Sequence, residues 1–175
     1  MSTTRGIDFS RLSLKDALDL AVLIEEEARD RYVEFAEQME VHHTPEAARF
    51  FRFMSGNEEK HRAELFERRQ QLFGDEPAAV SPTMLFDIEA PEYDEARVFM
   101  TARQALGAAM RSERKAHAFF VGALEGVQDA EVRALFDELR EEEVEHQRLV
   151  QVELDKLPPD PDLAADDFAD EPVAH

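Results

Sequence analysis

Glutamate and histidine recur at a metal-binding spacing at two places in the sequence. Glu58 and His61 form one Glu-x-x-His pair, and Glu143 and His146 form a second. Residues three apart lie on one face of a helix, so each pair would direct a carboxylate and an imidazole to the same side. Oxygen and nitrogen ligands together suit iron or manganese better than calcium, which prefers oxygen alone.

Two further glutamates complete the pattern once helical faces are traced. Glu25 and Glu113 each interrupt a run of apolar residues spaced four and three apart, and both Glu-x-x-His pairs do the same. Such a stripe turns toward the core, so four glutamates and two histidines are predicted to meet in one buried layer. Buried carboxylates would repel one another there. Two divalent cations would balance all four charges.

Other acidic residues near the motif are interpreted as solvent-facing. They lie off the inward stripe, and a solvated helix face is the simpler interpretation for Glu26, Glu27, Glu59, Glu141, Glu142 and Glu145. A single Glu-x-x-His pair means little in so acidic a chain, and an inert bundle with both pairs on its surface is the alternative. The inward position of both pairs favours the metal centre.

Four long helices are predicted to position these residues. They cover residues 14–39, 45–74, 101–126 and 129–157. Ser13 and Asp16 predict a capping box before the first helix, and Thr44-Pro45 predicts an N-cap followed by proline at the start of the second. Strict apolar alternation is absent, which argues against strands. The chain is therefore predicted to be all-α.

The connections between the helices predict the topology. Short links near residues 41–43 and 127–128 give two antiparallel hairpins. The segment 75–100 is long enough to cross a bundle of about 40 Å, so the second and third helices are predicted to be parallel. Residues 1–157 then form one bundle domain, and the Pro- and Asp-rich residues 158–175 form a disordered acidic tail.

The two hairpins also repeat in sequence. A shift of 85 residues places the first Glu-x-x-His pair and its apolar neighbours on the second pair, and a shift of 88 places Glu25 on Glu113. This match indicates an internal duplication of a helical hairpin.

The pattern resembles the ferritin-like di-iron superfamily, and within it most closely the rubrerythrins and related erythrin domains. The resemblance covers roughly residues 12–157 and is carried by the segments EEEARDRY at 25–32, EEKH at 58–61, ERKA at 113–116 and EVEH at 143–146. It implies a ferritin-like four-helix bundle that binds two iron ions, with manganese as an alternative metal.

The resemblance also implies a role for each candidate residue. One iron would be held by Glu25 and His61, the other by Glu113 and His146, and both would be bridged by Glu58 and Glu143. Tyr32 would donate a hydrogen bond to a ligand carboxylate and is the one candidate catalytic residue. A core aromatic residue with a satisfied hydroxyl is the alternative interpretation of Tyr32.

Two departures from the rubrerythrin pattern affect the expected reaction. The chain has no cysteine, so it cannot form the four-cysteine iron site of a rubredoxin domain. Ala116 stands where rubrerythrins tend to supply an additional third-helix glutamate. Both departures favour the simpler six-ligand centre of ferritins and bacterioferritins.

The predicted function is therefore a non-haem di-iron oxidoreductase of ferroxidase type, which oxidises Fe(II) with O2 or H2O2. A rubrerythrin-like peroxide reductase fed by an external electron donor is one alternative. A non-catalytic metal-binding interaction module is another, and a manganese catalase is conceivable with the same ligands.

Composition limits the remaining functions. The 175 residues include 40 acidic and 20 basic ones, for a net charge of -20, which argues against nucleic acid and anionic membranes as partners. The sequence has no apolar run of about 20 residues and no signal-peptide pattern, so a soluble cytoplasmic protein is expected. A homodimer or larger homo-oligomer is also expected, with Phe119 and Leu124 as exposed apolar positions.

Overall fold

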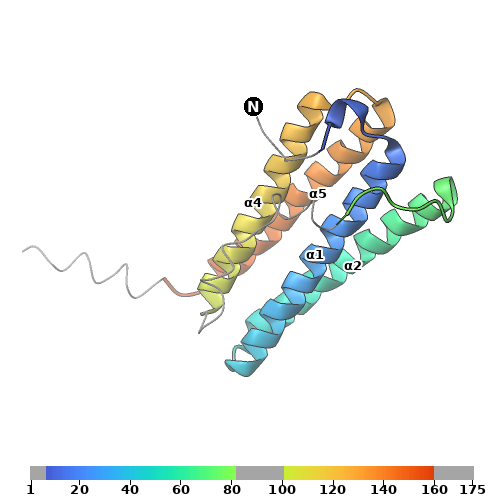
Figure 1. Cartoon of the computed structure of the whole chain (residues 1–175). Helices are drawn as coiled ribbons and strands as arrows, with labels where there is room; N and C mark the ends of the chain where they lie inside the picture. Colours follow the sequence, from blue (N-terminus) through green and yellow to red (C-terminus); the bar gives the residue numbers. More distant parts are fainter. Residues whose placement is uncertain (1–6, 82–100, 160–175) are drawn as a thin grey trace, which may run out of the picture.

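The computed structural model describes residues 7–81 and 101–159, and these residues form a bundle of long helices (Figure 1). The elements are the 3-10 turn η1 (Phe9–Arg11) and the helices α1 (Leu14–Val41), α2 (Pro45–Phe73), α4 (Ala102–Gly126) and α5 (Ala130–Asp155). The two described ranges contain no strand. The predicted all-α fold is confirmed, and the predicted helices agree with the observed ones to within about two residues.

Three of the helices begin at a side-chain cap. The Ser13 hydroxyl accepts a hydrogen bond from the backbone N–H of Asp16 at 3.1 Å, at the start of α1. Thr101 and Gln104 form a complete capping box at the start of α4, and Asp129 caps α5. These caps satisfy N–H groups that have no partner within the helix.

The structure corrects one predicted detail of the helix starts and refines a second. Asp16 does not complete a capping box with Ser13, because its carboxylate faces Lys15 Nζ at 3.5 Å. Thr44 occupies the predicted N-cap position of α2 and Pro45 follows it, but the Thr44 hydroxyl donates a hydrogen bond to the carbonyl of Met39 at 3.0 Å and makes no capping hydrogen bond. The helix begins with Pro45, which has no N–H to satisfy and whose fixed backbone angle suits the first turn.

The helices are arranged as two antiparallel hairpins, α1 with α2 and α4 with α5 (Figure 1). Helices α2 and α4 run in the same direction, opposite to α1 and α5. The end of α2 and the start of α4 therefore lie at opposite ends of the bundle, which fits the predicted crossover. Residues 82–100 of that crossover lie outside the described residues, as do residues 160–175 of the predicted tail.

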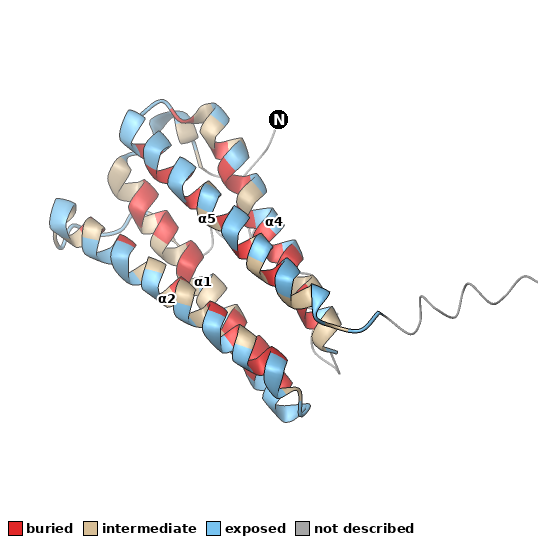
Figure 2. Cartoon of the chain, turned by 180° about the vertical axis from the view of Figure 1, so that it is seen from behind, coloured by how far each residue is buried: buried red, intermediate tan, exposed pale blue. Residues whose placement is uncertain are grey.

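The core consists of two apolar clusters. One cluster contains Leu18, Phe120 and Phe136, and the other contains Met39 and Phe51. The buried residues recur along the inward faces of the helices, while the outward faces are exposed (Figure 2). Each long helix contributes residues to both clusters, and one of the predicted glutamates lies between these two sets of residues. A polar layer therefore separates the clusters.

The expectation that Phe119 and Leu124 are exposed is wrong. Phe119 is 8% exposed, and its ring lies 5.8 Å from that of Phe9 in η1. Leu124 is partly buried against the same cluster. The residues of η1 cover this part of α4, which helical periodicity alone does not reveal. No helix of the described ranges has an apolar stretch able to cross a membrane.

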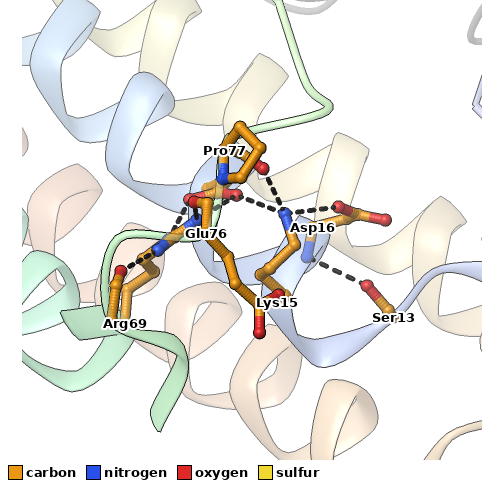
Figure 3. A network of polar contacts seen from close by, with 8 residues as sticks. Ser13, Lys15, Asp16, Arg69, Glu76 and Pro77 are labelled. Atoms are coloured by element: carbon orange, nitrogen blue, oxygen red, sulfur yellow. Dashed lines mark hydrogen bonds and ion pairs between the residues drawn. The ribbon is translucent and has the colours of Figure 1, made fainter. Parts of the chain in front are cut away.

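The end of α2 is joined to α1 by polar contacts around Arg69 (Figure 3). Arg69 is 5% exposed and its Nε donates a hydrogen bond to Asp19 Oδ1 at 2.7 Å. The same guanidinium donates to the carbonyls of Gly74 and Glu76, and Lys15 Nζ donates to the carbonyl of Pro77 at 2.8 Å. These contacts fix the first residues of the crossover against the bundle.

Candidate metal centre

The six side chains predicted as metal ligands come together between the two apolar clusters. Helix α1 supplies Glu25, α2 supplies Glu58 and His61, α4 supplies Glu113, and α5 supplies Glu143 and His146. Five of them are at most 5% exposed. The exception is His61, whose side chain is 20% exposed. The spacing of apolar residues therefore predicted the correct helix face for all six.

The two histidines mirror each other across this layer. Their rings stack with centroids 5.5 Å apart and an angle of 13° between the planes. His146 Nδ1 lies 3.5 Å from Glu113 Oε2, and His61 Nδ1 lies 3.9 Å from Glu25 Oε2. Each histidine thus faces the carboxylate with which the family resemblance pairs it, as expected for duplicated hairpins.

The ligand atoms fall into three overlapping groups, within each of which all atoms lie within 4.8 Å of one another. The groups are Glu25 with His61 and Glu142; Glu113 with Glu143 and His146; and Glu58 with His61 and His146. Glu58 therefore lies between the two ends of the layer, where a bridging carboxylate is expected. Glu143 lies at one end, with its Oε2 atom 3.9 Å from His146 Nδ1.

Glu142 corrects the sequence interpretation, which left it on a solvated helix face. Its Oε2 atom lies 3.5 Å from His61 Nδ1, and its side chain is 29% exposed. A residue directly before a core residue lies about 100° around the helix, so periodicity places Glu142 at the boundary of the core. Whether its long side chain reaches inward depends on how α5 packs against α2, which periodicity does not reveal.

The other five flanking glutamates lie at exposed or half-buried positions. They are Glu26, Glu27, Glu59, Glu141 and Glu145. Several of them pair with arginine at the surface: the carboxylate of Glu141 lies 2.6 Å from Arg140, and that of Glu145 lies 2.6 Å from Arg148.

Tyr32 joins the layer through its hydroxyl group. The side chain is 3% exposed, and the hydroxyl donates a hydrogen bond to Glu113 Oε1. Burial and the neighbouring charge of Glu113 raise the pKa of Tyr32 well above its ordinary value, so the phenol keeps its proton. Tyr32 is therefore a fixed hydrogen-bond donor that orients Glu113.

Burial controls the protonation of the layer, together with contacts between its members. Burial raises the pKa of Glu25 and of Glu143. Burial is the largest single effect on Glu113 and His146 as well, but their polar contacts together outweigh it. The attraction between the two groups, with contacts from Glu143 and Tyr32, lowers the pKa of Glu113. The charges of Glu113, Glu25 and Glu142 raise the pKa of His146. Burial lowers the pKa of His61, which favours the neutral imidazole that a metal requires.

The donor atoms fit a divalent metal. Three of them, His61 Nδ1, Glu142 Oε2 and Glu143 Oε2, are buried and make no hydrogen bond, which is costly for polar atoms. Neighbouring ligands of an ion with bonds of about 2.1 Å lie about 3 Å apart, and opposite ones about 4.2 Å apart. The distances of 3.3 to 3.9 Å between histidine nitrogens and carboxylate oxygens fall in this range.

Known proteins resemble this chain in both sequence and fold. The rubrerythrin family model matches residues 16–154, a range that includes all the residues of the layer. Among solved structures, a conserved protein of uncharacterised function from Magnetospirillum magnetotacticum MS-1 is 28% identical, with a TM-score of 0.72. That similarity covers 85% of this chain and 98% of the other. The sequence matches none of the curated proteins with which it was compared.

Proposed function

The chain belongs to the rubrerythrin family, and on this premise we propose that it is a non-haem di-iron oxidoreductase that oxidises Fe(II) with O2 or H2O2. The main support is the buried layer itself. Four glutamates and two histidines face one another between two apolar clusters, and the buried atoms His61 Nδ1 and Glu143 Oε2 make no hydrogen bond. A hydrophobic set of similar volume would stabilise a purely structural bundle at least as well.

The proposed ligand assignment follows the pairing of the side chains. Glu25 and His61 would hold one iron, and Glu113 and His146 would hold the other. Glu58, which lies between the two histidines, and Glu143, which lies beside His146, would complete the ligand set as the proposed bridges. When bound, the two irons supply one electron each, which together reduce the oxidant by two electrons. Manganese is an alternative occupant of the same oxygen and nitrogen ligands.

The remaining groups of the layer prepare it for this chemistry. The apolar clusters on both sides exclude bulk water, which strengthens the electrostatic interactions within the layer. Tyr32 holds Glu113 in one orientation through its hydroxyl proton. His61 is the most exposed of the six proposed ligands, so Fe(II) and a small oxidant have their shortest route to the layer on the side where α2 faces α5.

A rubrerythrin-like peroxide reductase is the second candidate function, and the family membership favours it. The two candidates differ in the reductant, which is the substrate Fe(II) in the first case and a separate electron donor in the second. The ligand layer is the same for both. The choice between them therefore depends on kinetics.

Stopped-flow oxidation of Fe(II) tests the proposal. The wild-type protein is expected to oxidise Fe(II) much faster than buffer does, and Glu58→Ala is expected to abolish that acceleration because it removes the proposed central bridge. Glu141→Ala, at a side chain that is 66% exposed, is the matched control and should retain the rate.

The oxidant and the reductant are varied in the same experiment. A rate enhancement with both O2 and H2O2 supports the ferroxidase. A protein that is slow with Fe(II) alone, but reduces H2O2 rapidly once a reductant is added, is a peroxide reductase. Binding of metal without either activity would indicate a non-catalytic metal-binding module and contradict the proposed oxidase.

A further inference from the structure

The two ends of the polar layer are not equivalent. The 85-residue shift that places the first Glu-x-x-His pair on the second also places Asn57 on Glu142. The end at His61 therefore has a carboxylate from α5 whose counterpart on α2 is an uncharged amide. The hairpins are duplicated, but this position differs between them in both charge and ligand strength.

The Glu142 carboxylate faces the same point as two of the proposed ligands. The donor atoms of Glu142, His61 and Glu25 all lie within 4.8 Å of one another. The Glu142 Oε2 and His61 Nδ1 atoms are 3.5 Å apart, and both are buried without making a hydrogen bond. At the other end of the layer, Glu143 groups with Glu113 and His146 instead.

The neighbours of Glu142 on α5 behave differently. Glu141 and Glu145 point outward and pair with Arg140 and Arg148 at the surface. Glu142 instead has His61 as its ion-pair partner, at a distance too long for a good hydrogen bond. A carboxylate oxygen and an imidazole nitrogen that approach each other in this way leave room for a cation that binds both.

We propose that Glu142 is a seventh ligand, which binds the metal held by Glu25 and His61. The inference rests on the proposed di-iron function and makes the two metal positions different. The position at His61 gains one additional negative charge, so it binds a divalent cation more tightly. It also lies on the more exposed side, since the Glu142 side chain is 29% exposed and that of His146 is 4% exposed. Glu142 would thus meet an incoming ion first.

Anaerobic titration with Co(II) tests this assignment, because the visible absorption of Co(II) reports on its ligands. The full-length wild-type protein is expected to bind two Co(II) ions in two steps of different affinity. Glu142→Gln is expected to weaken one step by about 10- to 100-fold, to alter the absorption of that ion and to leave the other unchanged. Glu141→Gln removes the same charge at the neighbouring exposed position and should change neither step.

A double variant identifies the affected position. If Glu142 and His61 bind the same ion, the losses in Glu142→Gln and His61→Ala should not add when the two changes are combined. Additive losses would overturn the assignment, as would a Glu142→Gln protein whose two affinities and spectra match the wild type. A wild-type protein that binds no metal would contradict the di-iron function itself, whereas normal binding by Glu142→Gln contradicts Glu142 alone.

Discussion

At the scale of single residues, the layer contains several buried carboxylates whose negative charges repel one another. Without metal, protons can neutralise these charges. Burial raises the pKa of Glu25 and Glu143, which favours their neutral forms. Glu113 and His146 favour an ion pair instead. Metal and protons therefore compete for the same oxygen atoms, and metal binding should release protons.

The competition predicts the pH dependence of stability without metal. A carboxyl group whose pKa is raised by folding contributes its full stabilisation at a pH below its pKa in the unfolded state. That contribution is lost as the pH rises through its pKa in the folded state. Burial and the nearby charge of Glu25 raise the pKa of Glu142 to about 7. The free energy of unfolding, measured with urea and a chelator, should therefore fall between about pH 5 and pH 8.

The glutamine variant is the control for this effect. Glu142→Gln removes one titrating group, so its stability should fall less steeply over the same pH range. Excess Mn(II) should flatten the wild-type curve, because the bound ion stabilises the ionised carboxylates. A metal-free wild-type protein that becomes more stable from pH 5 to pH 8 would contradict the protonation of the layer.

Tyr32 gives a second prediction at this scale. Tyr32→Phe keeps the ring in the core but removes the hydrogen bond to Glu113, so the free energy of unfolding should fall by about 1 to 2 kcal/mol. The Co(II) step assigned to Glu113 and His146 should weaken, while the step at His61 should not. Urea unfolding and the same titration measure both effects. Unchanged affinity at both positions would show that Tyr32 is only a core aromatic residue.

At the scale of helices, the parts of the fold that depend on local sequence were predictable. The Ser13 cap, Pro45 at the start of α2 and the glycine at its end mark helix ends to within a few residues. The inward stripes identified the four buried glutamates because a carboxylate in an apolar run is conspicuous. These features depend on 3.6-residue periodicity and on turn chemistry, both of which one sequence contains.

The features that escaped prediction depend on contacts between elements. Glu142 reaches the layer because α5 packs beside α2, and Phe119 is buried because η1 covers it. Neither contact leaves a periodic signal in either helix. In the sequence repeat, Asn57 of the first hairpin corresponds to Glu142 of the second. This difference was the one sign in the sequence that the position is not equivalent in the two hairpins.

Arg69 gives a prediction for the contact between helices α1 and α2. Its ion pair with Asp19 is partly buried, with side chains 6% and 10% exposed. Arg69→Ala removes the donor of the Gly74 and Glu76 carbonyls and leaves Asp19 only with Lys15 Nζ at 3.4 Å. The free energy of unfolding should fall by more than the loss of an exposed ion pair costs, because several hydrogen bonds are lost together. Arg49→Ala, at an exposed pair with Glu46, should lower it by about 1 kcal/mol or less. Equal losses in urea unfolding would contradict the structural role of Arg69.

At the scale of the whole molecule, the net charge of -20 has two parts. Four of the charges belong to the buried glutamates that two divalent ions would neutralise, which leaves -16. The remaining charge gives the surface an attraction for Fe(II) that salt would screen. The bundle thus combines an acidic exterior with an interior that needs cations, and the two hairpins meet at that interior layer.

Anaerobic Fe(II) titration of the purified chain, followed by elemental analysis, tests the central claim most directly. The proposal predicts saturation at two irons per chain, and loss of at least one of them in Glu58→Ala but not in Glu141→Ala. A correctly folded wild-type protein that binds no iron, or that binds iron equally well without Glu58, would contradict the di-iron centre.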